Sequence, residues 1–482
     1  MFTKLQNIVI VLLLIFLYGC STGNDITTNN NGKTDNDSAF VSTDVYCWLT
    51  STTQNAYLKR QNIALNFNNQ TNDFPTIVVD DTKSYQSMDG FGFALTGGSA
   101  YLINRLPAIQ RDSILHELFD VKANHIGISY LRISLGASDL SSSVYSYDDL
   151  GTSGTDTLLA NFSIHPESFD LIPVLKSIIA IQPNIKILAS PWSAPAWMKT
   201  NNSAVGGSLQ KKYFGVYADY FVKYIQAMEQ EGITIDAITP QNEPLNPNNN
   251  PSMYMSADDQ AEFIRDDLGP RFAQNNITTK IICYDHNCDV ASYPLTVLAD
   301  AGAYKYVDGS AFHLYSGSIT ALSTVHNQHP DKNVYFTEQW VGGPGNFAED
   351  LKWHINNLII GASRNWSKNV IEWNLASDPY YKPHTSGGCS TCQGGLTISN
   401  DITRNVSYYV VAHASKFVPY GSIRIDTNMP DYLSNVAFKT PSGNKALIVL
   451  NTAVDTRKFN IEYNGRMVTA SLPSGAVATY YW

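Results

Sequence analysis

Eight short apolar runs alternate with longer amphipathic segments between residues 89 and 416, and this alternation limits the possible fold more than any other feature of the chain. Segments such as residues 169–181 and 213–231 repeat apolar side chains every three or four positions, which is typical of helices that cover a sheet. Eight strand–helix units in succession predict an α/β fold, the (β/α)8 or TIM barrel. The expected strands lie at residues 90–95, 130–135, 186–190, 235–239, 280–284, 309–313, 334–337 and 370–373.

The two ends of the 482-residue chain do not follow this repeat. Residues 418–482 contain short β segments separated by turn sequences such as Asn464-Gly465, and residues 43–80 have a similar character. We therefore expect a β-sandwich built from both chain ends and packed against the barrel. The expected boundaries are 43–85 for the first sandwich strands, 86–416 for the catalytic barrel and 417–482 for the rest of the sandwich.

The first 20 residues are typical of an export signal. Lys4 precedes an eleven-residue apolar run, which is shorter than the roughly 20 residues that a membrane span requires. The run ends in Gly19-Cys20, which resembles a bacterial lipobox. The resemblance implies that residues 1–20 form a lipoprotein signal, that Cys20 carries the lipid, and that residues 21–42 form a flexible tether. It places the protein in the cell envelope, anchored in the outer membrane by this lipid alone. Ordinary secretion with a different cleavage point is the alternative.

The remaining cysteines fit an exported protein, because that compartment permits disulfides. Two close pairs are candidates for disulfides that each clip a loop, and a fifth cysteine, Cys47, is left without a partner. A zinc site is disfavoured because no histidine lies at ligand spacing beside either pair, so we expect no metal. The candidate disulfide cysteines are Cys283, Cys288, Cys389 and Cys392.

Charge and aromatic content narrow the class of ligand. Charged residues make up 15% of the chain, against about 25% in ordinary proteins. The net charge of −10 argues against nucleic acid and anionic membrane surfaces as partners. Aromatic residues make up 12%, and their flat faces suit an uncharged ligand such as a sugar. A large core accounts for them equally well on composition alone.

Two glutamates follow expected strands at the end of the barrel where active sites form. Glu243 lies in Asn242-Glu243-Pro244 after the fourth strand, and Glu338 follows the seventh. A single glutamate at a strand end is more often solvated or salt-bridged. A pair beside tryptophans is what glycosidic cleavage needs, because one carboxyl protonates the departing oxygen while the other attacks the sugar or activates water.

Several stretches, in order along the chain, resemble glycoside hydrolase family 30, which includes glucosylceramidases and β-1,6-glucanases. They lie at residues 89–96, 131–134, 189–195, 240–244, 336–338, 373–376 and 413–417. The resemblance implies a retaining mechanism with Glu243 as acid/base, Glu338 as nucleophile and no cofactor. It also implies that the sugar site is lined by Arg132, Asp139, Trp192, Asn242, His313, Tyr315 and Trp373.

Two of these residues have an ordinary structural alternative. Arg132 could serve only to orient a carboxylate, and His313 could be a buried histidine with satisfied hydrogen bonds. For the glutamates we expect Glu338 to be ionised. Its charge should raise the pKa of Glu243 so that this residue holds a proton.

Loop sequences favour β-1,6-glucan as the substrate. Residues 252–255, 283–288 and 387–395 resemble the β-1,6-glucanase subfamily more than the lipid-cleaving enzymes, and residues 246–250 form a polar, asparagine-rich loop. The alternatives within the family are a glucosylceramidase or a β-glucosidase or β-xylosidase, because specificity lies in loops. An alternative of another class is a non-catalytic, surface glycan-binding lipoprotein.

Overall fold

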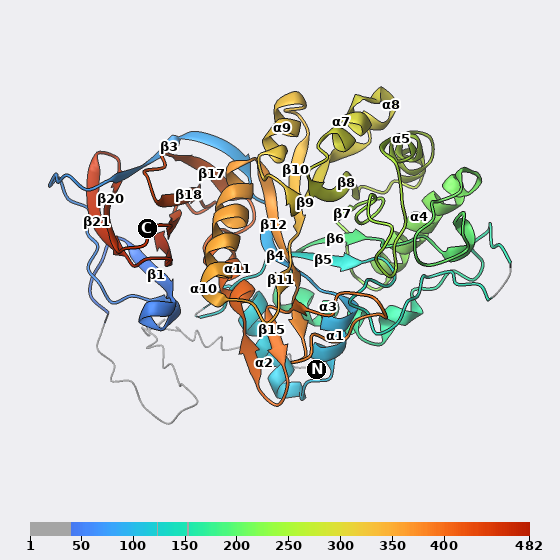
Figure 1. Ribbon diagram of the computed structural model, residues 1–482, viewed down its shortest axis with the longest axis horizontal. Coiled ribbons are helices and arrows are strands. Elements are labelled where there is room, and N and C mark those ends of the chain that lie inside the picture. The colour runs from blue at the N-terminus through green and yellow to red at the C-terminus, as the bar shows by residue number, and fades with distance from the viewer. Residues whose placement is uncertain (1–39, 123, 152–153) are drawn as a thin grey trace, which may run out of the picture. The chain divides into compact units, whose positions relative to one another are not determined.

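The computed structural model describes residues 40–122, 124–151 and 154–482, shown in Figure 1. The signal peptide, Cys20 and residues 21–39 of the expected tether lie outside these residues. Within the described part of the chain, none of the helices combines the length and the apolar character that crossing a bilayer requires.

The expected barrel is confirmed. Eight strands close it in the order β10-β12-β4-β5-β6-β7-β8-β9, and every neighbouring pair is parallel. Strand β7 is shorter than expected, whereas β8 and β9 run several residues further toward the mouth. The barrel strands are β4 (Gly90–Ala94), β5 (Tyr130–Ser134), β6 (Lys186–Ser190), β7 (Ala237–Ile238), β8 (Lys280–Cys288), β9 (Val307–Gly317), β10 (Asn333–Glu338) and β12 (Ser367–Asn374).

Helices cover the barrel, and a π-helix, η5 (Phe263–Leu268), lies between α5 and α6. A second π-helix, η6 (Ile355–Ala362), follows α10. The helices are α1 (Gly97–Asn104), α2 (Ala108–Phe119), α3 (Leu171–Ile181), α4 (Phe214–Gln230), α5 (Ala257–Glu262), α6 (Gly269–Gln274), α7 (Ser292–Ala299), α8 (Ala301–Tyr304), α9 (Ala321–Gln328), α10 (Phe347–His354) and α11 (Val406–Ser415).

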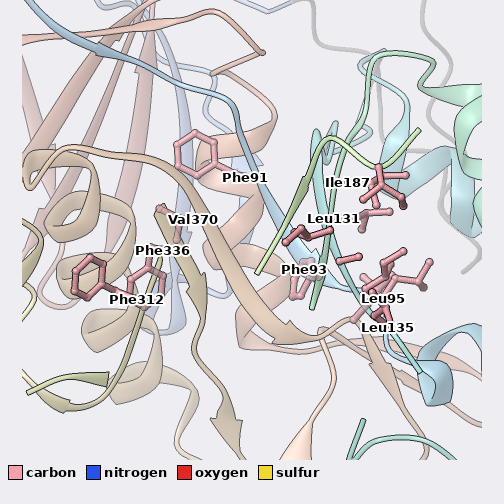
Figure 2. Close-up of a cluster of buried hydrophobic side chains, with 14 of the residues drawn as sticks. Phe91, Phe93, Leu95, Leu131, Leu135, Ile187, Phe312, Phe336 and Val370 are labelled. Atoms are coloured by element: carbon pink, nitrogen blue, oxygen red, sulfur yellow. The ribbon is translucent and has the colours of Figure 1, made fainter. Parts of the chain in front are cut away.

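Side chains alternate between the two faces of the barrel strands, as the period of two requires. Leu131, Phe336 and Val370 belong to the large core that the strands share with the helices (Figure 2). Their neighbours Tyr130 and Tyr335 pack with Ile371 in a separate cluster. Residues two apart on a strand share a face. Polar residues near the strand ends therefore point into the barrel interior, above the cluster of Tyr130, Tyr335 and Ile371.

A nine-stranded sheet draws strands from both chain ends, as expected. Its order is β2-β1-β22-β19-β18-β17-β3-β20-β21. The sheet has a hydrophobic core of its own. Its strands are β1 (Tyr46–Ser51), β2 (Ala56–Arg60), β3 (Thr76–Ser87), β17 (Ile423–Thr427), β18 (Leu433–Lys439), β19 (Lys445–Asn451), β20 (Arg457–Tyr463), β21 (Arg466–Leu472) and β22 (Val477–Tyr481).

One buried histidine joins the sheet to the barrel helices. His413 of α11 hydrogen-bonds through its two ring nitrogens to Thr50 of β1, at 2.8 Å, and to Thr479 of β22, at 2.9 Å. Burial lowers the pKa of His413 to about 3, so the ring is neutral at ordinary pH. Both chain ends are thus fixed against the same barrel helix.

Only one of the two expected disulfides is present among the described residues. Cys389 and Cys392 are bonded, whereas Cys283 and Cys288 are buried free thiols, so the prediction for that second pair was wrong. Both thiols lie on strand β8, and a regular strand separates residues five apart by about 16 Å, well beyond disulfide reach. Burial raises the pKa of both thiols to about 12. Cys47 is buried and free, as expected.

Candidate active site

A cavity of about 650 Å³ opens at the end of the barrel where the strands finish. Of the predicted site residues, six line it, whereas Arg132, Asn242 and His313 lie beneath its surface. The lining residues are Asp139, Trp192, Glu243, Asn246, Asn248, Asn249, Asn287, Tyr315, Glu338, Trp340, Trp373, Gly387, Gly388, Cys389 and Cys392. The rim is therefore mostly polar, with tryptophan faces in the wall.

Glu338 ends strand β10 and is held by two donors. The Arg132 guanidinium donates from Nη1 to Oε2 at 2.6 Å, and the Tyr315 hydroxyl donates to Oε1 at 2.8 Å. Burial raises the pKa of Glu338 above its ordinary value, although His313 and Arg132 oppose this shift. The two donors leave the carboxylate in one orientation toward the cavity.

Glu243 follows strand β7 in a left-handed backbone conformation, with φ of 44°. Its backbone N–H donates to the carbonyl of Asp285 at 2.9 Å, which fixes this turn against strand β8. Its carboxylate accepts from Asn246 at 2.8 Å and lies 3.3 Å from Nδ1 of His313. Such conformations are costly and concentrate at functional sites.

His313 connects the two glutamates. Its Nδ1 lies 3.3 Å from Glu243 and 3.7 Å from Glu338, and its Nε2 lies 3.1 Å from Asp285. Burial alone would lower the pKa of His313, but the charge of Glu338 and the two hydrogen-bonded carboxylates raise it to about 9. The ring is therefore protonated at neutral pH and donates from both nitrogens.

The pKa order expected for the two glutamates was wrong. Burial favours the protonated form of Glu243, but the hydrogen bond and charge of His313 outweigh it and lower the pKa of Glu243 below its ordinary value. The expectation took account of the two glutamates only, whereas protonated His313 lies between them. The raised pKa of His313 favours the proton on its ring, 3.3 Å from the carboxylate of Glu243.

Asp285 is the main site residue that sequence reasoning missed. Strand β8 was expected to end at Tyr284, but left-handed conformations at Tyr284 and Asp285 let it continue, with a register shift against β9. The Asp285 side chain is fully buried below the glutamates. It accepts from Arg132 at 2.8 Å, Ser190 at 2.8 Å, Thr239 at 2.7 Å and Thr337 at 2.7 Å, besides its contact with His313.

These donors explain why Asp285 is ionised and what Arg132 does in the site. Burial favours protonation of Asp285, but the Arg132 guanidinium and the hydrogen bonds hold its pKa well below the ordinary value. Arg132 has no exposed surface and also donates to Asn242 at 2.6 Å. It orients carboxylates below the cavity, which is the structural alternative named above.

Aromatic faces form the wall above Arg132. Trp192 and Trp373 are stacked, with ring centroids 5.3 Å apart, and the guanidinium carbon of Arg132 lies 4.9 Å from the Trp192 centroid. Trp340 lines the same cavity and was absent from the predicted set. Its position directly after Glu338 and Gln339 was the available signal, because residues after barrel strands face the mouth.

Three side chains of the site could hold a cation. Single ligand atoms of Glu243, His313 and Glu338 lie within 4.8 Å of one another, and no other such group of three occurs in the part of the chain that the structure describes. His313 is protonated at neutral pH, which opposes metal binding because a ligating imidazole must be neutral. The same measurement places an oxygen of Glu243 within 4.8 Å of one of Glu338.

A parallel barrel with paired carboxylates and tryptophans at its mouth defines a glycoside hydrolase. Residues 88–418 match the TIM-barrel domain of glycosyl hydrolase family 30, and residues 421–480 match the β-sandwich domain of that family. The chain belongs to glycosyl hydrolase family 30, and it is an O-glycosyl hydrolase.

The relatives include proteins named as endo-1,6-β-glucanases and as glucosylceramidases. The chain is 36% identical over 437 residues to an endo-1,6-β-D-glucanase of Aspergillus fumigatus, covering 84% of this chain and 87% of that protein. It is 28% identical to the lysosomal acid glucosylceramidase of Mus musculus, covering 86% and 84%. Among solved structures, the endo-β1,6-glucanase BT3312 superposes with a TM-score of 0.85 at 35% identity, covering 92% of this chain and 99% of that one.

Proposed function

We propose that the protein is a retaining endo-β-1,6-glucanase. The observation that carries the mechanism is the approach of Glu243 and Glu338, each of which has one carboxylate oxygen within 4.8 Å of an oxygen of the other. Retaining enzymes hold their two carboxyl groups about 5–5.5 Å apart, whereas inverting enzymes leave room for a water at about 6.5–9.5 Å. The substrate rests on the relatives, three of which are named as endo-1,6-β-glucanases at 33–36% identity.

The first step forms a glycosyl-enzyme. The Glu338 carboxylate attacks the anomeric carbon, the bond to the departing O6 breaks, and Glu243 gives a proton to that oxygen. We infer that Glu243 receives this proton from Nδ1 of His313, 3.3 Å away. The transfer turns a charged pair into a neutral pair and changes no net charge.

The second step hydrolyses that ester. In the glycosyl-enzyme, Glu338 no longer carries the negative charge that raises the pKa of His313. The pKa of His313 therefore falls, and the ring stays neutral after giving up its proton. Glu243 then takes a proton from water as the water oxygen attacks the anomeric carbon. The Glu338 carboxylate leaves, and two inversions give retention.

Product analysis on a linear β-1,6-glucan tests the reaction. We expect short oligosaccharides of mixed length at early times, and proton NMR should show the β-anomer as the first new reducing end. A linear β-1,3-glucan should release little. Appearance of the α-anomer first would contradict retention, and glucose as the only early product would contradict endo action.

A glucosylceramidase is the second candidate, because relatives of that name cover most of the chain at 28–30% identity. The polar rim disfavours it, since Asn246, Asn248 and Asn249 line the cavity where a lipid leaving group would need apolar surface. Glucosylceramide in detergent belongs in the same product analysis. Faster release of glucose from it than of oligosaccharides from β-1,6-glucan would favour the second candidate.

We also propose that the exported protein is attached to the outer membrane through a lipid on Cys20. The support is the apolar run followed by Gly19-Cys20. Labelled palmitate fed to bacteria that express the full chain should enter the protein, and Cys20→Ala should abolish both the label and membrane attachment. Thr22→Ala is the matched control and should retain both. Membrane attachment of the unlabelled Cys20→Ala variant would contradict the proposal.

A further inference from the structure

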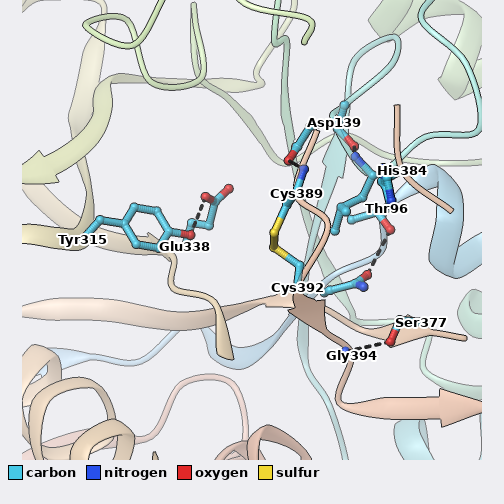
Figure 3. Close-up of a disulfide and its surroundings, with 12 residues drawn as sticks. Thr96, Asp139, Tyr315, Glu338, Ser377, His384, Cys389, Cys392 and Gly394 are labelled. Carbon is cyan, nitrogen blue, oxygen red and sulfur yellow. Dashed lines mark hydrogen bonds between the residues drawn. A yellow bond between two sulfur atoms is a disulfide. The ribbon is translucent and has the colours of Figure 1, made fainter. Parts of the chain in front are cut away.

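The cavity wall contains a covalently closed turn that the mechanism above does not use. Cys389 and Cys392 are bonded to each other and both line the cavity. Figure 3 shows the disulfide beside Asp139, and the hydrogen-bonded pair Tyr315 and Glu338 lines the same cavity. The disulfide therefore belongs to the surface that a bound sugar would face.

Asp139 depends on this turn for its position. Its side chain is 5% exposed, and within the described part of the chain it has no cationic partner within ion-pair distance. The Asp139 carboxylate accepts a hydrogen bond at Oδ2 from the Cys389 backbone N–H, at 3.3 Å (Figure 3). Burial, and then the charge of Glu338, raises the pKa of Asp139 to about 7.

The turn backbone packs directly on Asp139. The Asp139 carbonyl accepts from the Thr385 N–H at 2.8 Å. A Cβ placed on Gly388 would lie 2.5 Å from that carbonyl oxygen, so only glycine fits there. Gly387 precedes it with φ of 81°. Two successive glycines give the segment before Cys389 more backbone freedom than any other residues would.

The other end of the disulfide is firmly placed. Cys392 is buried in a cluster with Trp192 and Trp373. It also pairs with Gly342 where β14 (Cys392–Gln393) meets β11 (Val341–Gly342), directly after Trp340. The bond therefore connects the glycine-containing turn beside Asp139 to the tryptophan wall of the cavity.

We propose that the Cys389–Cys392 disulfide is a positioning element of the sugar site, which holds the Cys389 N–H against Asp139 and so keeps that acceptor preorganised for substrate. This rests on the proposed function and on the expectation that Asp139, which lines the sugar site, binds a sugar hydroxyl. Without the bond, the glycine segment must be ordered each time substrate binds, which weakens binding and leaves the reacting glutamates unchanged. A bridge between residues three apart closes a very short loop, so its effect on global stability is small.

The test is the double variant Cys389→Ser/Cys392→Ser, assayed on linear β-1,6-glucan. We expect KM to rise about tenfold, the upper end for the loss of one ordinary hydrogen bond, while kcat stays within about twofold. The melting temperature should change by only a few degrees. Ser390→Ala, an exposed position within the same turn, is the matched control and should leave KM unchanged.

Reduction of the intact protein gives the same comparison without mutation. A phosphine converts the disulfide to two thiols and becomes a phosphine oxide, with water supplying the oxygen and the two protons. The wild type should then show the raised KM and recover on reoxidation, whereas the double variant should not respond. This arm decides the matter if the double variant does not fold.

Asp139→Asn separates this proposal from the proposed function. In the Asp139→Asn background, opening the disulfide should change KM by less than about twofold, because contacting residues are not additive. A full tenfold change in that background, or an unchanged KM in the reduced wild type, would overturn the positioning role. An unchanged KM in Asp139→Asn alone would instead overturn the assignment of Asp139 to substrate binding.

Discussion

Replacing Glu338 by Gln is expected to lower kcat/KM by about three orders of magnitude or more, because the amide cannot form the glycosyl-enzyme ester. Gln keeps the size of the side chain, so the Tyr315 hydroxyl retains an acceptor. The measurement is turnover of an activated aryl β-gentiobioside, which contains the β-1,6 linkage. Glu349→Gln, a surface position paired with Lys352, is the control and should retain full activity.

Rescue of activity by azide distinguishes the roles of Glu243 and Glu338. Glu338→Gly leaves space for azide on the face opposite the leaving group, so rescue should yield the α-glycosyl azide. Glu243→Ala still forms the glycosyl-enzyme from a good leaving group, and azide should then give the β-glycosyl azide. The reverse pattern of anomers would exchange the two roles, and substantial activity in Glu338→Gln would reject its assignment as nucleophile.

Removing Asp285 is expected to have the largest effect on stability together with a loss of activity. Asp285→Ala removes the shared acceptor of three hydroxyl groups and one carboxylate partner of the buried Arg132 guanidinium, which keeps only Glu338 and Asn242, and this should cost about 3–5 kcal/mol. It also removes a carboxylate that keeps His313 protonated. Chemical denaturation and the rate on the aryl substrate measure the two effects.

Asp285→Asn keeps the shape of the side chain and removes its negative charge. His313 has a raised pKa, so its contribution is fully present below pH 6.5 and is lost as the pH rises through about 9. Asp285 has a depressed pKa, so its contribution is lost in acid. The stability difference between wild type and Asp285→Asn should therefore be largest near pH 4–6.5 and should shrink toward pH 9.

The control for both Asp285 variants is Asp236→Ala, which removes a partly exposed ion pair with Lys186 at the other end of the barrel. Exposed pairs contribute about 1 kcal/mol or less. Its loss should leave the rate on the aryl substrate intact. If Asp285→Ala destabilises no more than this control, the buried network does not support the site as described.

Much of this architecture was predictable because it follows from periodicity. The strand–helix alternation gave the barrel, and the rule that active sites form at strand C-termini brought Glu243 and Glu338 to one mouth. The period of two then explains why Arg132, two residues after Tyr130, faces inward. These inferences need only local patterns and one general property of the fold.

What escaped prediction depends on particular backbone and charge arrangements. Asp285 enters the site through left-handed conformations at two residues with side chains, which carry no glycine signal. The run Asp285-His286-Asn287 was a weak hint, since these residue types tolerate that conformation better than most. The expected pKa order of Glu243 and Glu338 was wrong because His313, between them, has a raised pKa and carries the proton. The expected Cys283–Cys288 disulfide was wrong because strand β8 continues through both residues.

The position of β3 in the sheet affects how the chain acquires its fold during synthesis. This strand precedes the barrel, yet its partners β17 and β20 are made about 340 and 380 residues later. At about 5–20 residues per second, β3 waits roughly 20–70 s without its neighbours. Both edges of β3 stay unpaired during this interval, and a chaperone that covers them would protect the nascent chain from strand-edge aggregation.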